Sequence, residues 1–179
     1  MSFFVRARSL TDGELALLQP IFRDALNYQK IRVYPRRYLP FQAALIAMSP
    51  NGAMFFPRDT LYCDDFSCTS YRYITLFIHE AVHIWQHQMG FPVRLSGLCI
   101  ALKGGYKKQK AYQYKHLLEK YQRFSQFNME QQAEIITDYF VTQYFYQQPL
   151  TELHPILQDF LDNPKNKKLL PENICFQAA

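Results

Sequence analysis

The residues best suited to chemistry lie in one short segment, His79-Glu80-Ala81-Val82-His83, which has the pattern H-E-x-x-H. In a helix, two histidines four residues apart lie one turn apart on the same face. Both imidazoles can then bind one Zn²⁺ ion at ~2.0–2.1 Å. Glu80 stands next to the first histidine and can reach a zinc-bound water without binding the metal. That is the position of a general base.

The residues around this motif predict a buried helix from Tyr73 to Gly90. The segment is mostly apolar, as expected of a helix inside a core. Ser70 or Thr69 is a suitable N-cap, and Gly90 followed by Pro92 marks the end. Ionisable side chains in such a helix are costly unless they are paired or bind a metal. The alternative is that both histidines are ordinary buried residues that match the pattern by chance.

A catalytic zinc ion usually has three protein ligands and one open position, so the motif requires a third ligand. His87 cannot bind the same ion as His79, because eight residues of helix rise ~12 Å. The third ligand must come from another element, and the best candidate is a helix predicted from Asn128 to Gln147. Asn128 is a favourable N-cap, and Gln131 stands at the position that completes a capping box.

This second predicted helix carries Glu130, Glu134 and Asp138, four residues apart and therefore on one face. We expect Glu130 to bind the zinc ion. Glu134 would then accept a hydrogen bond from the outer nitrogen of a ligand histidine and fix its tautomer, and Asp138 would extend that network. The alternative is a solvated acidic edge.

The rest of the chain predicts a mainly helical α+β fold with a small antiparallel sheet in the N-terminal half. Thr11 to Glu14 has the capping-box form T-x-x-E and starts a helix that Pro20 should kink or divide. Ile31 to Tyr34 predicts a short strand. Ala43 to Met48 and Ala53 to Phe56 flank a turn containing Pro, Asn and Gly, which predicts a strand, a tight turn and a strand.

The second half of the chain predicts short elements besides the helix that starts at Asn128. We expect a single domain over residues 1–179, because no linker or repeat interrupts the chain, with a loosely held tail from about residue 163. The predicted elements are a helix from Leu95 to Leu102, a strand from Ala111 to Tyr114, and helices from Leu117 to Phe124 and Leu153 to Leu161.

Composition and charge narrow the possible partners. The chain has 179 residues, a net charge of +5 and a pI near 9.0, which weakly favours anionic partners such as cell-wall polymer, nucleic acid or an acidic protein. The alternative is an ordinary solvated surface. The basic residues are scattered and no nucleic-acid motif accompanies them, so we expect no nucleic-acid partner. No apolar run is long enough to span a membrane. The N-terminus lacks the features of a secretory signal peptide, which predicts cytoplasmic storage in the producing cell.

The four cysteines form no C-x-x-C pair, so a zinc site made of cysteines alone is disfavoured. We expect free thiols. Cys63 and Cys68 are five residues apart in a polar loop and could close a small disulfide in an oxidising compartment.

The two motifs together resemble the gluzincin group of zinc metallopeptidases, in which H-E-x-x-H is followed by E-x-x-A-[DE] on a later helix. The second motif here runs from Glu130 to Glu134, EQQAE. The resemblance implies that Glu130 is the third zinc ligand and that the acid four residues on supports the site. That acid is usually Asp, and here it is Glu134.

The sequences around the two motifs, FIHEAVHIWQHQ and FNMEQQAEIITDYF, resemble those of small metallopeptidase domains associated with bacterial contractile injection systems. These include type VI secretion spike-related proteins and extracellular injection-system peptidases. LTDGELALLQPIF and MSPNGAMFFP are similar as well, so the resemblance covers most of residues 9–146. It implies a zincin-like fold and an effector or toxin peptidase exported from a Gram-negative bacterium, with a secretion-spike partner and an immunity protein.

The expected reaction is zinc-assisted hydrolysis of an amide bond in a protein, with Glu80 moving a proton from water to the leaving amine. A tyrosine or histidine often stabilises the oxyanion in such sites. The candidates are Tyr112, Tyr139, Tyr144 and His154.

Two alternatives to a protease remain. One is a peptidoglycan amidase or endopeptidase with the same zinc chemistry, which the positive charge favours and which would act in the periplasm of a target cell. The other is a zinc-stabilised spike adaptor without turnover, in which a fourth protein ligand would close the metal site.

Overall fold

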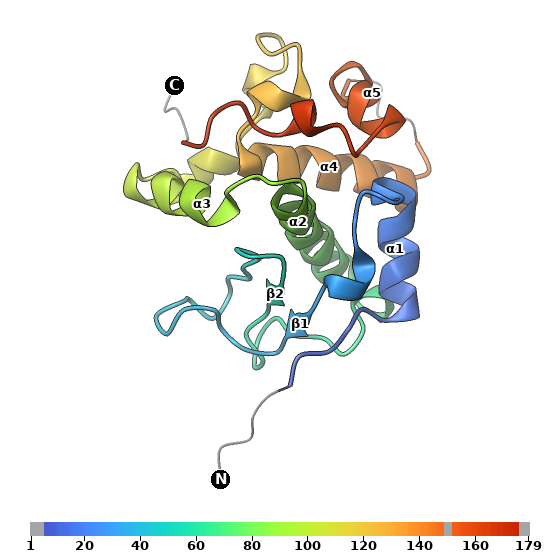
Figure 1. The fold of residues 1–179 in the computed structure, drawn as a ribbon, viewed down its shortest axis with the longest axis vertical. Helices are drawn as coiled ribbons and strands as arrows, with labels where there is room; N and C mark the ends of the chain where they lie inside the picture. The colour runs from blue at the N-terminus through green and yellow to red at the C-terminus, as the bar shows by residue number, and fades with distance from the viewer. Residues whose placement is uncertain (1–5, 149–151, 176–179) are drawn as a thin grey trace. The chain divides into compact units, whose positions relative to one another are not determined.

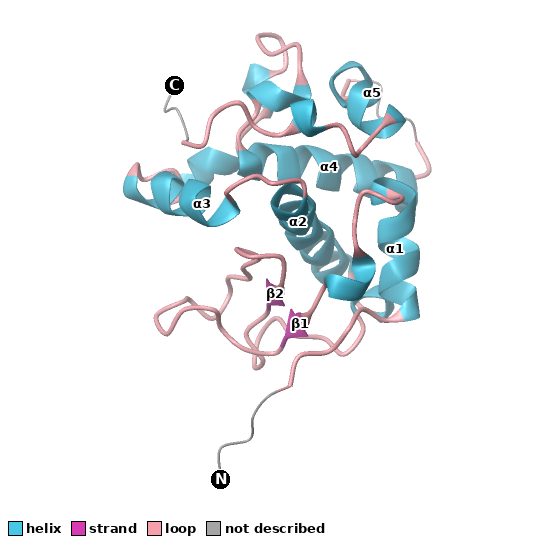
Figure 2. Cartoon of the chain, viewed as in Figure 1, coloured by secondary structure: helices cyan, strands magenta, loops and turns pink. Residues whose placement is uncertain are grey.

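The computed structural model describes residues 6–148 and 152–175, in which helices and loops dominate (Figures 1 and 2). The chain divides into two compact units, Met1–Gln88 and Met89–Ala179. None of the helices in the described ranges is both long enough and apolar enough to cross a lipid bilayer. Each unit is built around one long helix that carries part of the chemistry predicted from the sequence.

The first unit begins with α1 (Asp12–Phe22), whose start is fixed by the predicted capping box. The Thr11 hydroxyl accepts a hydrogen bond from the backbone N–H of Glu14 at 3.1 Å, and the Glu14 carboxylate accepts one from the N–H of Thr11 at 3.0 Å. The helix continues through Pro20 as one element. Because Pro20 stands close to the C-terminal end, its missing N–H removes a hydrogen bond only from the last turn.

Glu14 also holds three segments of this unit together. Its carboxylate is fully buried and forms a two-point ion pair with the Arg8 guanidinium at 2.7 and 2.8 Å. It also accepts a hydrogen bond from the N–H of Phe66 at 3.1 Å. Arg8 in turn donates to the carbonyl of Cys63 at 2.9 Å. A buried carboxylate needs such compensation, so this cluster fixes both the N-terminal segment and the loop before the motif helix onto α1.

The only sheet within residues 6–148 and 152–175 has two strands, β1 (Val33–Tyr34) and β2 (Met54–Phe55), and they are parallel. The predicted antiparallel sheet is therefore wrong. A long connection over residues 35–53 returns the chain to run in the same direction, as parallel pairing requires. In the described part of the chain, antiparallel pairing is limited to isolated bridges, one of which joins Met48 to Phe55 across the predicted turn.

The predicted motif helix is confirmed as α2 (Tyr71–Gln88). Its apolar residues are buried, and α1 and β2 both contact it. Three fully buried rings link the end of β2 to this helix: Phe56 lies 4.4 Å from Phe66 between ring centroids, and Phe66 lies 5.1 Å from Phe77. The chain then reaches Gly90 with φ of +102°, a conformation that favours glycine and confirms the predicted stop.

The second unit contains α3 (Val93–Leu102), α4 (Met129–Tyr144) and α5 (His154–Asp162). The predicted cap of α4 is confirmed. The Asn128 side chain accepts hydrogen bonds from the N–H groups of Glu130 and Gln131 at 2.9 and 3.0 Å, and the Gln131 side chain accepts from the N–H of Asn128 at 3.0 Å. This cap fixes the backbone on either side of Glu130.

The segment between α3 and α4 differs from prediction. The strand predicted at Ala111 to Tyr114 and the helix predicted at Leu117 to Phe124 are replaced by short 3₁₀ turns. The amides of two capping-box residues of α4 hold this segment by its carbonyl groups. Asn128 donates to Ala111 at 3.1 Å and Gln131 donates to Gln113 at 2.8 Å. Tertiary hydrogen bonds therefore override the local preference of this segment.

The tail is also more firmly held than we predicted. Gln132 donates its side-chain amide to the carbonyl of Leu169 at 2.8 Å, and the N–H of Glu172 donates to the carbonyl of Ser125 at 2.8 Å. A disulfide joins Cys99 of α3 to Cys175. The prediction that all thiols are free is therefore wrong, because the pairing depends on two cysteines 76 residues apart.

Removing this disulfide should lower the free energy of unfolding. For a sequence separation of 76 residues, the chain-entropy estimate is about 4.5 kcal/mol. We therefore expect Cys99→Ser to unfold at a clearly lower urea concentration than the oxidised wild type, as followed by circular dichroism. The matched control is the pair Cys63→Ser and Cys68→Ser, which removes the two free thiols and should leave the midpoint unchanged. Equal midpoints for Cys99→Ser and the control would contradict this prediction.

Candidate metal centre

Helix α2 places His79 and His83 on one face, one turn apart. Their ring centroids are 5.0 Å apart and the rings are nearly perpendicular, at 80°. His83 is buried, whereas His79 is half-buried and so accessible from one side. Glu80, which follows His79, is also buried. Two imidazoles and a carboxylate in these positions match the metal-binding and proton-accepting roles predicted from the motif.

A buried glutamine orients the second histidine. The side-chain oxygen of Gln86 lies 2.9 Å from Nδ1 of His83, and Gln86 is fully buried. An amide oxygen at this nitrogen requires the proton on Nδ1, which leaves the lone pair of Nε2 for a metal ion. Sequence reasoning missed Gln86. Its signal was a polar residue three positions after His83, directly after the apolar Ile84 and Trp85.

The carboxylate of Glu130 is buried in the first turn of α4. The helix N-terminus stabilises a negative charge there. The hydroxyl of Tyr106 donates a hydrogen bond to Oε1 of Glu130 at 2.8 Å. This contact restrains the carboxylate through one of its oxygens. Tyr106 was also missed, because the sequence offers thirteen tyrosines and nothing local distinguishes this one.

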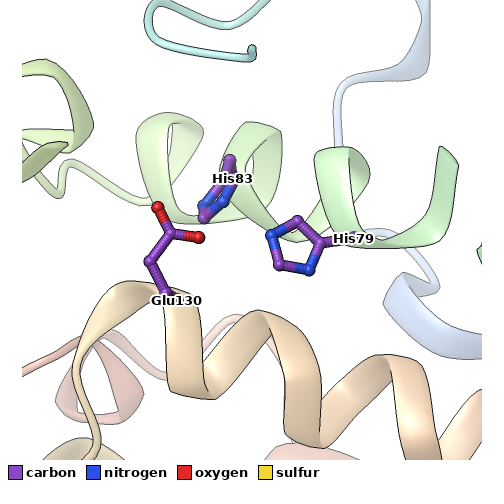
Figure 3. A group of neighbouring side chains, drawn as sticks. All are labelled: His79, His83 and Glu130. Carbon is purple, nitrogen blue, oxygen red and sulfur yellow. The ribbon is translucent and has the colours of Figure 1, made fainter. Parts of the chain in front are cut away.

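His79, His83 and Glu130 form one group of candidate ligands whose ligand atoms all lie within 4.8 Å of one another (Figure 3). Two imidazole nitrogens and a carboxylate oxygen are the donor set of many catalytic zinc sites. Ligand atoms around a tetrahedral zinc ion lie roughly 3.4 Å apart, given bonds of about 2.0–2.2 Å. In the kind of donor atom that they offer, the residues present therefore fit zinc.

The other two acids of α4 lie further along the helix. Glu134 is half-buried, one turn after Glu130, where the sequence predicts an acid that supports a ligand histidine. Asp138 is two turns after Glu130, or ~12 Å along the axis. It accepts a hydrogen bond from the hydroxyl of Tyr114. Burial, together with this carboxylate, raises the pKa of Tyr114 well above its usual value, so the phenol stays a donor. Asp138 thus ties α4 to the preceding loop.

The predicted oxyanion stabilisers are spread over the second unit. Tyr144 lies ~21 Å along the axis of α4 from Glu130 and stacks on Phe140, which argues against a role beside a metal ion held by Glu130. Tyr139 lies ~13 Å along the same axis. His154 is exposed at the start of α5. Tyr106 is the tyrosine that the structure brings into contact with Glu130.

Tyr112, also predicted as an oxyanion stabiliser, lies close to that contact. Its ring centroid is 5.9 Å from that of Tyr106. Of the predicted candidates, it is therefore the one that the structure brings beside the tyrosine bound to Glu130.

Comparison with known proteins assigns the chain to a family, although no family model matches it. It is 34% identical over 138 residues to the type VI secretion system spike protein VgrG2b of Pseudomonas aeruginosa strain PAO1. The match covers 75% of this chain but only 13% of the spike protein, so the chain corresponds to a small part of that relative.

Among solved structures, the fold matches an effector domain, that of P. aeruginosa VgrG2b. The TM-score is 0.73 and the sequence identity 31%, and the match covers 84% of each chain. The chain belongs to the family of the VgrG2b effector domain.

The contacts of Gln86 and Tyr106 predict that both residues support metal binding. Gln86→Leu frees the tautomer of His83, and Tyr106→Phe removes the restraint on Glu130. Loss of such supporting hydrogen bonds typically costs 10–100-fold in metal affinity. We expect that loss for each variant when zinc affinity is measured by competition with a chelator. The matched control is Tyr121→Phe, because the Tyr121 ring packs on Phe127 instead. Unchanged affinity in folded Tyr106→Phe would show that the contact has no role in metal binding.

A second series separates the three acids of α4. Glu130→Ala should abolish tight zinc binding, because the two histidines that remain are too few ligands for a stable site. Glu134→Ala should keep measurable zinc with an affinity 10–100-fold lower. Asp138→Ala should have the smallest effect, because its described partner is Tyr114. The measurement is again chelator competition, after circular dichroism has shown that each variant is folded. Zinc retained by Glu130→Ala but lost by Glu134→Ala would move the third ligand one turn along the helix.

Proposed function

We propose that this domain is a zinc-dependent hydrolase that cleaves amide bonds. The observation that carries the proposal is the group formed by His79, His83 and Glu130, with the buried Glu80 between the two histidines in sequence. The group has three members among the described residues, which matches a catalytic site with an open position better than a structural site closed by four ligands. Bound zinc would supply a Lewis acid for the scissile carbonyl and lower the pKa of a water molecule toward ~7.

The protein's own residues would divide the remaining tasks. Gln86 holds the proton on Nδ1 of His83, so Nε2 is available as a ligand. Tyr106 restrains one oxygen of Glu130. Glu80 accepts the proton of the attacking water and passes it to the leaving amine, a step that typically contributes 10²–10⁴-fold to the rate. Glu80 is buried on the same helix as both candidate ligand histidines, directly after His79.

We propose further that the domain is a bacterial effector delivered by a type VI secretion system. The support is its membership in the family of the VgrG2b effector domain and its similarity to part of a secretion spike protein. Its partners would then include a spike and an immunity protein. The Cys99–Cys175 disulfide suits an oxidising compartment, which favours action in the periplasm of a target cell over action in a reducing cytoplasm.

The substrate class has two candidates, a protein and the peptide part of peptidoglycan. The net charge of +5 and the disulfide favour the second candidate, because the cell wall is anionic and is reached in the periplasm. Both substrates contain amide bonds, so the zinc chemistry is the same. The spike adaptor without turnover is the remaining alternative.

Glu80→Gln tests whether the site is catalytic. The amide cannot accept the proton of water, so we expect hydrolysis to fall at least 10²-fold while zinc stays bound. The assay incubates zinc-loaded protein with purified peptidoglycan and, separately, with a panel of proteins, and detects products by mass spectrometry. Glu119→Gln is the matched control, because it makes the same change at an exposed residue. Wild-type protein that holds stoichiometric zinc but cleaves neither substrate class would favour the adaptor.

A further inference from the structure

The first unit exposes an apolar loop that the proposed chemistry does not explain. Residues 36–46, RRYLPFQAALI, connect β1 to β2, and Figure 1 draws them in light blue as a loop that projects from the two strands. We call these residues the apolar loop. Phe41 is 98% exposed, and three further large apolar side chains are about half exposed or more: Leu39 at 48%, Leu45 at 66% and Ile46 at 52%. Soluble proteins rarely expose such a cluster without a binding role.

The apolar loop is held in shape by a buried glutamine. The side-chain oxygen of Gln42 accepts hydrogen bonds from the N–H groups of Tyr38 and Leu39, at 2.7 and 3.3 Å. Its amide donates to the carbonyl of Ile46 at 2.6 Å. Thr60 donates a further hydrogen bond to the carbonyl of Ala44. A loop with these internal bonds presents its apolar side chains to solvent in a defined arrangement.

The charged residues on the stretch of chain that carries the apolar loop, residues 25–58, have one sign, and Asp59 follows directly. Arg36 and Arg37 are exposed at its start, and the Arg36 guanidinium lies over the rings of Tyr34 and Phe55, at 5.2 and 5.5 Å from their centroids. Residues 25–58 contain no acidic residue. The five basic residues in that stretch are Lys30, Arg32, Arg36, Arg37 and Arg58. Exposed apolar side chains next to two exposed arginines fit a partner that is anionic at its surface and apolar beneath.

We propose that the apolar loop binds the surface of a lipid bilayer that contains anionic lipids. Phe41 and Leu45 would enter the boundary between headgroups and acyl chains, and Arg36 and Arg37 would contact lipid phosphates. A bilayer accepts a projecting tip without a complementary cavity, whereas a protein partner would need a pocket for Phe41. Through this loop, the domain binds to the surface of the membrane.

Helix α3 offers a comparison within the second unit. Leu95, Leu98 and Leu102 are exposed on it, and residues 81–118 also contain no acidic residue. The apolar loop and the exposed face of α3 both combine apolar side chains with a stretch that lacks acidic residues. Variants of each surface, measured with the same vesicles, distinguish the two.

The direct test uses Phe41→Trp. The chain has one tryptophan, Trp85, which is fully buried, so the new indole is the exposed reporter. Titration with vesicles of phosphatidylglycerol mixed with phosphatidylcholine should shift its emission to the blue, and brominated lipids should quench it. Vesicles of phosphatidylcholine alone should bind much more weakly, and added salt should weaken binding to the anionic vesicles. The readout does not depend on hydrolysis, so it stands or falls separately from the zinc chemistry.

Single substitutions then assign the contacts in a vesicle co-sedimentation assay. Phe41→Ser should reduce partitioning into vesicles about tenfold or more, because the variant loses the aromatic side chain that enters the bilayer. The control is Tyr146→Ser, which removes an exposed aromatic elsewhere. Arg36→Gln with Arg37→Gln should reduce partitioning about fivefold for each arginine. The control for charge is Lys167→Gln with Lys168→Gln, which removes the same charge from exposed positions in the second unit.

The vesicle assays distinguish results that support the proposal from results that overturn it. Loss of vesicle binding with the Phe41 and arginine variants, and retention with both controls, supports the proposal. Equal binding to neutral and anionic vesicles, or a loss with Leu98→Ser on α3 but none with Phe41→Ser, overturns it. Absence of vesicle binding alongside binding to an acidic protein or to DNA would also overturn it.

Discussion

The structure depends on the burial of ionisable side chains. Glu14, Glu80, His83 and Glu130 are all nearly inaccessible to solvent, and burying such groups without partners is costly. Glu14 is compensated within the protein by the Arg8 guanidinium and a backbone N–H. His83 is hydrogen-bonded to Gln86 and Glu130 to Tyr106, and both belong to the candidate ligand group with His79. The same physical constraint is thus met by an ion pair in one place and coincides with a candidate metal centre in another.

The parts of the site that could be predicted from sequence are those encoded locally. Helical spacing places His79 and His83 on one face, and the capping residue Asn128 fixes the register of Glu130 on α4. Gln86 was within reach, because a polar residue three positions from a candidate ligand histidine on a buried helix needs a partner. Tyr106 was not, since its contact with a residue 24 positions away depends on the fold of a loop without periodic structure.

The same distinction explains the errors in the predicted fold. The turn between Met48 and Phe55 is local, and an antiparallel bridge does form there. The partner of β2, however, is β1, from before a long loop, and no local signal specifies that parallel pairing. The disulfide and the attachment of the tail to α3 and α4 are likewise contacts between distant residues. Such contacts are selected by the packing of the whole unit and cannot be read from a short window of sequence.

The molecule departs from the usual distribution of residues in two opposite ways: some ionisable side chains are buried, and some large apolar side chains are exposed. Hydrophobic residues scattered on a surface are ordinary, whereas a buried ionisable group and a large exposed apolar patch are informative. In this chain the buried exceptions include Glu80, His83 and Glu130. The exposed exceptions include Phe41 and Leu45, on a loop whose shape is fixed by Gln42. The buried group coincides with the candidate ligands of a metal ion. The exposed patch is the surface for which we propose contact with an anionic bilayer.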